Sequence, residues 1–243
     1  METIKKIHPI VGLGIIIGSS FLIVGIIAAA TVFRVRALND TISVTGSAKM
    51  QVTSDESKWT GQITRTVYES DLKGGYAQLA NDLASVKAYF ASAGIADTDY
   101  TVSPIVMNEV YQQNDSAPKK YILTQTFEVQ SNDVQKLTSA STNSVQLINK
   151  GVVFSTVALE YYYSKLPDAR ITLLSQAITD AKSRAAELAK NSGKTIGALR
   201  NASSGVVQVQ SLNSTDVADY GTYDTSKIEK QITVTVKASF SLK

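Results

Sequence analysis

The stretch ITVTVKASFSL, residues 232–242, indicates the fold class, because apolar and polar side chains alternate along it without a fault. Its apolar positions are Ile232, Val234, Val236, Ala238, Phe240 and Leu242, and threonine, lysine and serine fill the others. Successive side chains of a strand point to opposite faces, so this period of two predicts a strand with one buried face. One solvated face is typical of an antiparallel sheet.

Upstream of this strand the chain alternates strand-like and helix-like segments. Residues 41–69 predict two strands around a turn at 53–57, and further strands are expected at 100–111, 120–130, 151–163 and 206–212. Helices are expected from Asp71 to Gly94, after a cap at 131–133, and from Pro167 to Gly193. The third helix shows an apolar stripe of Ile171, Leu174, Ile178, Ala181, Ala185 and Leu188. The order predicts an α+β fold, an antiparallel sheet of about seven strands with three helices.

One membrane-spanning helix is expected before this domain. Residues 10–33 contain no charged side chain, and at ~1.5 Å per residue a helix of this length crosses a ~30 Å hydrocarbon core. We therefore divide the chain into a tail (1–9), an anchor (10–33), a linker (34–40) and one domain (41–243). A cleaved signal sequence remains the alternative, since Ala28-Ala29-Ala30 resembles a cleavage site.

The expected location is the cell membrane, crossed once. The basic residues flanking the anchor are nearly balanced, so the short tail before it and the folded mass after it decide the orientation. The carboxy-terminal domain is then outside the cytoplasm. Gly14, Gly18 and Gly25 lie near one side of the anchor, where small residues let two helices approach closely in lipid.

Composition excludes several classes of function. The chain has 24 basic and 21 acidic residues, and its first 36 residues contain four of the basic ones and one of the acidic ones. The remaining chain therefore has no basic excess, and nucleic-acid binding is not expected. Cysteine is absent and the single histidine is His8 in the tail. A Cys/His zinc cluster and a Ser-His-Asp or Cys-His arrangement are therefore impossible in the domain. We expect no catalytic residue, metal or cofactor.

Three stretches resemble the SIMPL-domain family of envelope proteins: ISVTGSAKMQVTSDESKWTGQI from residue 42, FASAGIADTDYTVSP from residue 90, and AITDAKSRAAELAKNSGKTIGAL from residue 177. The first departs from the family at Ser54, where a proline is typical, and at Ala48, where a glycine is common. The resemblance implies an exported or membrane-anchored domain, oligomeric assembly and a loose association with envelope stress. It brings no catalytic residues.

The remaining motifs have ordinary structural explanations. NSGKT (191–195) lacks the upstream glycine of a phosphate-binding loop and is expected to end a helix. Ser116 and Lys119 have a Ser-x-x-Lys spacing but lie in a polar loop. The loop 213–226 gathers acids and tyrosines, namely Asp216, Asp219, Asp224, Tyr220 and Tyr223, without calcium-loop spacing, and its role stays open.

We expect a non-enzymatic membrane protein that forms a homo-oligomer, more readily a closed ring than a filament. Besides the anchor glycines, the candidate contacts between copies are Tyr161 and Tyr163 on a strand and Ala181 and Ala185 on the third helix. Two alternatives stay open. One is a monomeric binding module for a cell-wall or protein ligand; the other is a hydrolase using two carboxylates, Asp97 with Asp99 or Asp55 with Glu56.

Overall fold

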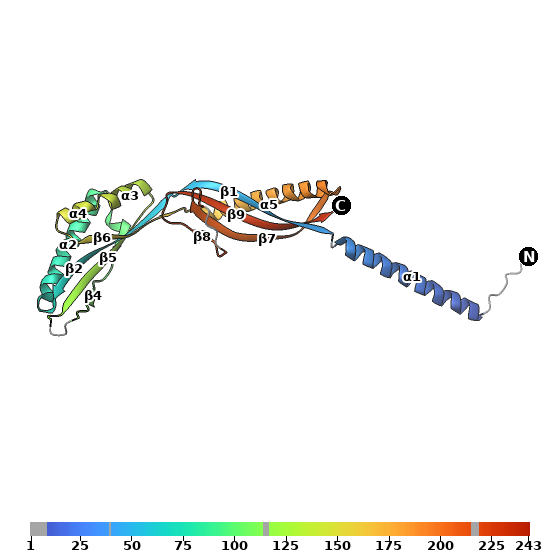
Figure 1. Cartoon of the computed structure of the whole chain (residues 1–243), viewed down its shortest axis with the longest axis horizontal. Coiled ribbons are helices and arrows are strands. Elements are labelled where there is room, and N and C mark those ends of the chain that lie inside the picture. Colours follow the sequence, from blue (N-terminus) through green and yellow to red (C-terminus); the bar gives the residue numbers. More distant parts are fainter. Residues whose placement is uncertain (1–8, 39, 114–116, 215–218) are drawn as a thin grey trace, which may run out of the picture. The chain divides into compact units, whose positions relative to one another are not determined.

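The computed structural model describes residues 9–38, 40–113, 117–214 and 219–243 (Figure 1). Two compact units divide the chain. Unit 1 comprises residues 1–48, 174–205 and 235–243, and unit 2 comprises residues 49–173 and 206–234. The boundaries fall within β1 (Thr41–Thr53), α5 (Leu166–Asn191), β7 (Ile196–Ser211) and β9 (Glu229–Leu242).

The described strands form two sheets. The first has the order β1-β9-β7-β8, where β8 is Thr222–Tyr223 and runs parallel to β7. The second has the order β3-β5-β2-β6, and β4 also pairs with β5; every pair in this sheet is antiparallel. Its strands are β2 (Glu56–Tyr68), β3 (Tyr100–Val102), β4 (Val106–Glu109), β5 (Lys120–Ser131) and β6 (Phe154–Tyr162).

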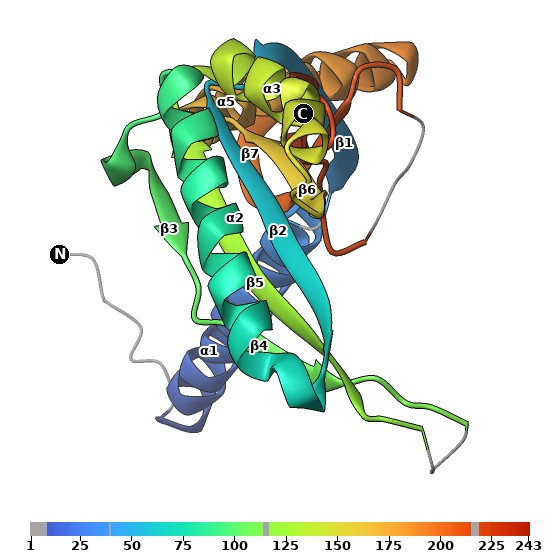
Figure 2. The same cartoon turned by 90° about the vertical axis from the view of Figure 1, so that its left-hand side faces the viewer.

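Unit 2 is built around an aromatic core beneath its helices α2 (Leu72–Ser92), α3 (Val134–Asn143) and α4 (Val145–Asn149). Trp59 on β2 packs edge-on against Phe90 of α2 and Phe127 of β5, with ring centroids 5.7 and 5.8 Å away. Figure 2 shows α2 lying across β2 and β5. Short 3₁₀ turns, η1 (Glu69–Asp71) and η2 (Asp97–Asp99), flank α2.

Unit 1 packs α5 on its part of the β1-β9-β7 sheet. The contact is close because small residues meet: a Cβ on Gly46 of β1 would lie 2.2 Å from the carbonyl oxygen of Ala177 and 2.5 Å from the amide nitrogen of Ala181. The alternation is confirmed from residue 232 to residue 240, since Ile232, Val234, Val236, Ala238 and Phe240 are all buried. It is wrong at the end of β9, where Ser241 is buried and Leu242 is only partly buried.

The α+β class is confirmed, but the expected counts are wrong. The described residues form nine strands and four helices besides the amino-terminal one, in two sheets. The strand expected at 100–111 is broken at Ser103-Pro104, where the ring of proline removes a backbone donor. The second helix is interrupted at Ser144, and β1 and β2 are consecutive in sequence but pair in different sheets.

The face expected to be buried on the third helix is also wrong in part. The side chains buried on α5 are Ala169, Leu173, Ala177, Ala181, Ala185 and Ala189, at a four-residue spacing. Ile171 is 70% exposed and Leu188 is 53% exposed. The alanines form the buried face because only small side chains let α5 approach β1 as closely as it does at Gly46. The larger aliphatic residues lie beside the alanine stripe.

The apolar segment near the amino terminus is a helix, α1 (Pro9–Leu38). Residues 12–32 are long and apolar enough to cross a membrane, a test that a signal sequence also passes. The segment 34–40, expected to be a linker, is helical as far as Leu38. The hydroxyl groups of Ser19, Ser20 and Thr31 donate to backbone carbonyls one turn earlier, which satisfies them within the helix.

Candidate functional site

A polar cavity with a volume of about 560 Å³ lies in unit 2. Three segments that are distant in sequence line it: residues 98–101 of η2 and β3, residues 128, 130 and 131 of β5, and residues 132, 133 and 136 at the start of α3. The pairing of β3 with β5 brings the first two together, since Tyr100 opposes Val129. The chain then turns from β5 into α3, which closes the third side.

Hydrogen bonds fix several of these lining groups. Asp133 caps α3 by accepting from the amide of Lys136 at 2.9 Å, as its position predicted. The ammonium group of Lys136 donates to the carbonyl oxygen of Gly94 at 3.2 Å. One oxygen of Asp99 accepts from the hydroxyl of Thr98 at 3.1 Å. The rim of the cavity is therefore held in place by local contacts.

The charges around the cavity are mostly negative. Glu128 pairs with Lys58 at 2.8 Å, and the hydrogen bond from Lys58, aided by one from Gln130, lowers the pKa of the Glu128 carboxyl. Tyr100 donates its hydroxyl to Asp97 at 2.7 Å, and burial together with this bond raises the pKa of Tyr100 to about 12. The tyrosine hydroxyl is therefore a neutral, fixed group at neutral pH.

Three of the four acids considered for a hydrolase make local structural contacts, and the fourth, Glu56, is exposed. Asp97 and Asp99 hold the η2 turn through the bonds just described. Asp55 accepts from both the amide and the hydroxyl of Ser164, at 2.7 and 2.8 Å. Partial burial opposes ionisation of Asp55, but these bonds prevail and lower its pKa. Among the described residues, no group of three or more histidine, aspartate or glutamate side chains is arranged to hold a metal ion.

A second notable feature of unit 2 is the segment 222–228, which we call the strap. The amide of Tyr161 donates to the carbonyl of Thr225 at 2.8 Å, and the amide of Tyr163 donates to the hydroxyl of Tyr223 at 2.8 Å. Tyr162 packs against the Tyr223 ring, with centroids 5.9 Å apart. The strap thus covers the end of β6, and part of the loop 213–226 acquires a structural role.

A fully buried lysine, Lys230, is bonded to the backbone of the strap. The ammonium group of Lys230 donates to the carbonyl oxygens of Asp224 and Lys227 and lies 5.6 Å from the centroid of the Tyr223 ring. Burial lowers the pKa of Lys230. Sequence reasoning overlooked this residue, although it continues the period of two upstream of Ile232 and so lies on the buried face of β9.

The proposed contacts between copies lie in different surroundings. Tyr161 is buried, with its hydroxyl 3.0 Å from that of Thr138, whereas Tyr163 is partly exposed. Ala181 and Ala185 are fully buried in unit 1, so packing within one chain accounts for their spacing. A Cβ added at Gly14, Gly18 or Gly25 would meet no atom of the described residues within 4 Å, apart from the nearby backbone of α1.

The remaining sequence motifs are easily placed. Gly193, with a φ of +74°, ends α5, and Lys194 pairs with Asp40 at 2.6 Å, so NSGKT is a helix end. Ser116 and Asp216 lie outside the described residues. Asp219 and Tyr220 are exposed, while Asp224 is tied to Ser226 through 2.7 and 2.8 Å bonds within the strap.

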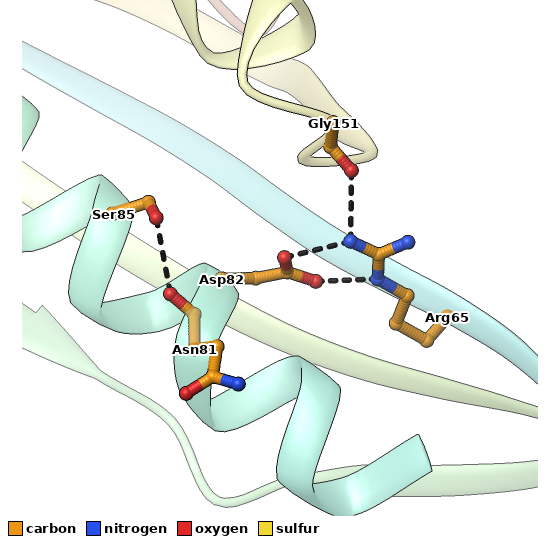
Figure 3. A network of polar contacts seen from close by, with 5 residues as sticks. All are labelled: Arg65, Asn81, Asp82, Ser85 and Gly151. Atoms are coloured by element: carbon orange, nitrogen blue, oxygen red, sulfur yellow. Dashed lines mark hydrogen bonds and ion pairs between the residues drawn. The ribbon is translucent and has the colours of Figure 1, made fainter. Parts of the chain in front are cut away.

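A partly buried ion pair ties the helical layer of unit 2 to its sheet (Figure 3). The guanidinium of Arg65 on β2 makes two bonds to the carboxylate of Asp82 on α2, at 2.5 and 2.7 Å, and a third to the carbonyl of Gly151 at 2.8 Å. The bond to Asp82 raises the pKa of Arg65. These bonds join β2 to α2 and to the backbone at Gly151.

Unit 1 presents two open strand edges. β9 lies between β1 and β7, so β1 and β7 are the edge strands there. Residues 198–205 of β7 are exposed at every position, so neither face of this segment is covered. Within the described part of the chain, no strand pairs with the outer edge of β1, and β8 pairs with β7 only at Gln208 and Val209.

Comparisons with known proteins agree with the resemblance seen in the sequence. A family model named SIMPL, described as "Protein of unknown function (DUF541)", matches residues 42–240. No curated protein matches the chain. Because the family match spans most of the chain and covers both sheets, the chain belongs to the SIMPL family.

Proposed function

We propose that this chain is a non-enzymatic, membrane-anchored envelope protein that assembles into a closed homo-oligomer through the strand edges of unit 1. The observation that carries this proposal is the pair of open edges on β1 and β7. An unpaired edge offers a row of backbone donors and acceptors to another strand, and natural proteins usually cover or charge such edges. The β7 segment 198–205 has one charged residue, Arg200, within eight positions.

The arrangement of the edges favours a ring. β1 and β7 are different surfaces on opposite sides of the same sheet, so an edge-to-edge contact joins β7 of one copy to β1 of the next. Such a heterologous contact generates a ring when the rotation between copies closes and a filament when it does not. Closure leaves no unpaired edge, which is why we favour the ring.

The location outside the cytoplasm and a link to envelope stress belong to the same proposal. The first rests on the apolar helix α1 with the folded mass after it, and the second on the family resemblance alone. Absence of enzyme activity is supported by the composition, which leaves the domain without cysteine or histidine.

The test measures particle mass of the full chain in mild detergent. Leu199 on β7 is 46% exposed, and Leu199→Lys places a charge on the proposed contact. Leu188→Lys makes the same change at an exposed position on α5 of unit 1 and is the matched control. We expect an oligomer for the wild type and the control, and a smaller particle for Leu199→Lys. A monomeric wild type, or the same mass for both variants, contradicts the proposal.

A further inference from the structure

The polar cavity of unit 2 has the size and the lining of a ligand-binding site, which self-assembly does not explain. Ligand sites commonly have volumes of about 300–1,000 Å³, and this cavity falls within that range. It is bounded by η2, β3, β5 and α3, all within one unit. From its lining we propose that it binds an uncharged, hydroxyl-rich ligand of the saccharide class.

The first argument is the unused hydrogen-bonding capacity of the lining. In the described part of the chain, the side chains of Thr101 and Asn132 make no hydrogen bond, and Gln130 uses its amide nitrogen on Glu128 while its oxygen stays free. Only one oxygen of Asp133 is used, in the helix cap. The cavity therefore offers donors and acceptors side by side. A hydroxyl group is both a donor and an acceptor, so a polyol satisfies such a mixture.

The second argument is charge. Carboxylates of Asp99, Glu128 and Asp133 line the cavity from three segments. Among the described lining residues Lys136 is the one cation, and Lys58 pairs with Glu128 from outside the lining. Glu128 remains ionised because Lys58 and Gln130 stabilise its charged form. An anionic ligand such as a phosphate or a sugar acid would meet these charges at short range, which disfavours its binding.

The third argument is the aromatic wall. Tyr100 lines the cavity, and its ring packs against the ring of Phe90, with centroids 5.0 Å apart. Its hydroxyl is held by Asp97, so the ring has a fixed orientation. Small-molecule sites combine such an apolar surface with a few placed polar groups. A sugar ring, apolar on its C–H face and polar at its rim, matches this combination.

Two double variants test the proposal in the full-length protein. Thr101→Val with Asn132→Ala removes the two free polar side chains from the cavity. Thr142→Val with Asn143→Ala makes the same chemical change at exposed positions of α3 outside the cavity lining. All four positions are exposed, so we expect both variants to retain the fold. Thermal unfolding of each variant checks this.

Binding is measured by saturation-transfer NMR and calorimetry with chitotetraose and maltotetraose as uncharged probes. Trigalacturonate is the anionic probe and spermidine the cationic one. We expect an uncharged oligosaccharide to bind, the cavity variant to weaken it about tenfold, and the α3 variant to bind like the wild type. The proposal is overturned if neither uncharged probe binds, if both variants behave alike, or if trigalacturonate or spermidine binds in the cavity more tightly.

Discussion

Among individual residues, the Arg65–Asp82 pair gives the clearest stability prediction. The Asp82 side chain is 7% exposed and that of Arg65 is 25% exposed, so removing one partner leaves a poorly hydrated charge. We expect Arg65→Met to lower the free energy of unfolding by about 3 kcal/mol. The double variant Arg65→Met, Asp82→Leu should recover much of this loss, because no charge is then left unpaired.

The coupling of this pair is measured by urea unfolding of the wild type, of Arg65→Met, of Asp82→Leu and of the double variant. Arg184→Met is the control, since Arg184 pairs with Asp180 on the exposed face of α5. Equal losses for Arg65→Met and Arg184→Met would contradict the assignment of Arg65 as the structural partner of the buried Asp82 carboxylate.

The buried lysine beneath the strap predicts a dependence of stability on pH. Burial lowers the pKa of Lys230 below its ordinary value of 10.5, so between the folded and unfolded pKa values the unfolded chain binds more protons. Stability contributed by this residue therefore rises with pH across that window. Lys230→Met should flatten the slope of unfolding free energy against pH in the alkaline range up to pH 10.

Lys227→Met is the matched control for the pH measurement, because Lys227 is an exposed neighbour in the strap. The range stops at pH 10 because burial raises the pKa of Tyr223 and of Tyr89, whose titration changes stability in the opposite direction at higher pH. An unchanged slope in Lys230→Met would show that the ammonium is not desolvated in solution.

Among helices and strands, the contact between β1 and α5 depends on one glycine. A Cβ on Gly46 would lie 2.8 Å from the Cβ of Ala181 and closer still to the α5 backbone, so a side chain there pushes the helix off the sheet. We expect Gly46→Val to lower the free energy of unfolding by more than about 2 kcal/mol. Thr45→Val, at the exposed neighbouring position of β1, should leave it nearly unchanged. Chemical denaturation checks both.

The sequence predicts the buried face of β9 better than the buried face of α5. Period-two alternation identified β9 correctly because burial of one face leaves a local trace in the sequence. The buried face of α5 was predicted correctly at Ala181 and Ala185 but wrongly at Ile171 and Leu188. The alanine stripe is the core side because Gly46, 131 residues before Ala177, lets β1 approach it closely, and this contact leaves no local trace in the sequence. The polar cavity was not predictable at all, since its lining comes from three segments that no single motif connects.

For the entire chain, the anchor and the open edges of unit 1 should act together. Tethering copies to one surface raises their effective concentration, so contacts between edges can be individually weak. We expect deletion of residues 1–36 to reduce self-association without abolishing it. Gly14→Leu with Gly18→Leu should reduce it less, by hindering close approach of α1 helices. Sedimentation equilibrium compares the three chains, and an oligomer unchanged by either alteration would mean that α1 has no part in assembly.

The last prediction concerns retention of α1 in the membrane. Apart from Ser19, Ser20 and Thr31, the described side chains within the span are apolar, and these three hydroxyls bond within the helix, so nothing described there needs water. A lysine near the centre costs about 3 kcal/mol of insertion free energy, so Leu22→Lys with Ile23→Lys should abolish stable insertion. We expect the wild-type chain to resist carbonate extraction from membranes with Met1 still attached, and the variant to be extracted. Mass spectrometry showing a mature chain that begins after Ala30 would establish a cleaved signal sequence instead. The edges of unit 1 would then have to drive assembly without the tether, and the oligomer should dissociate on simple dilution.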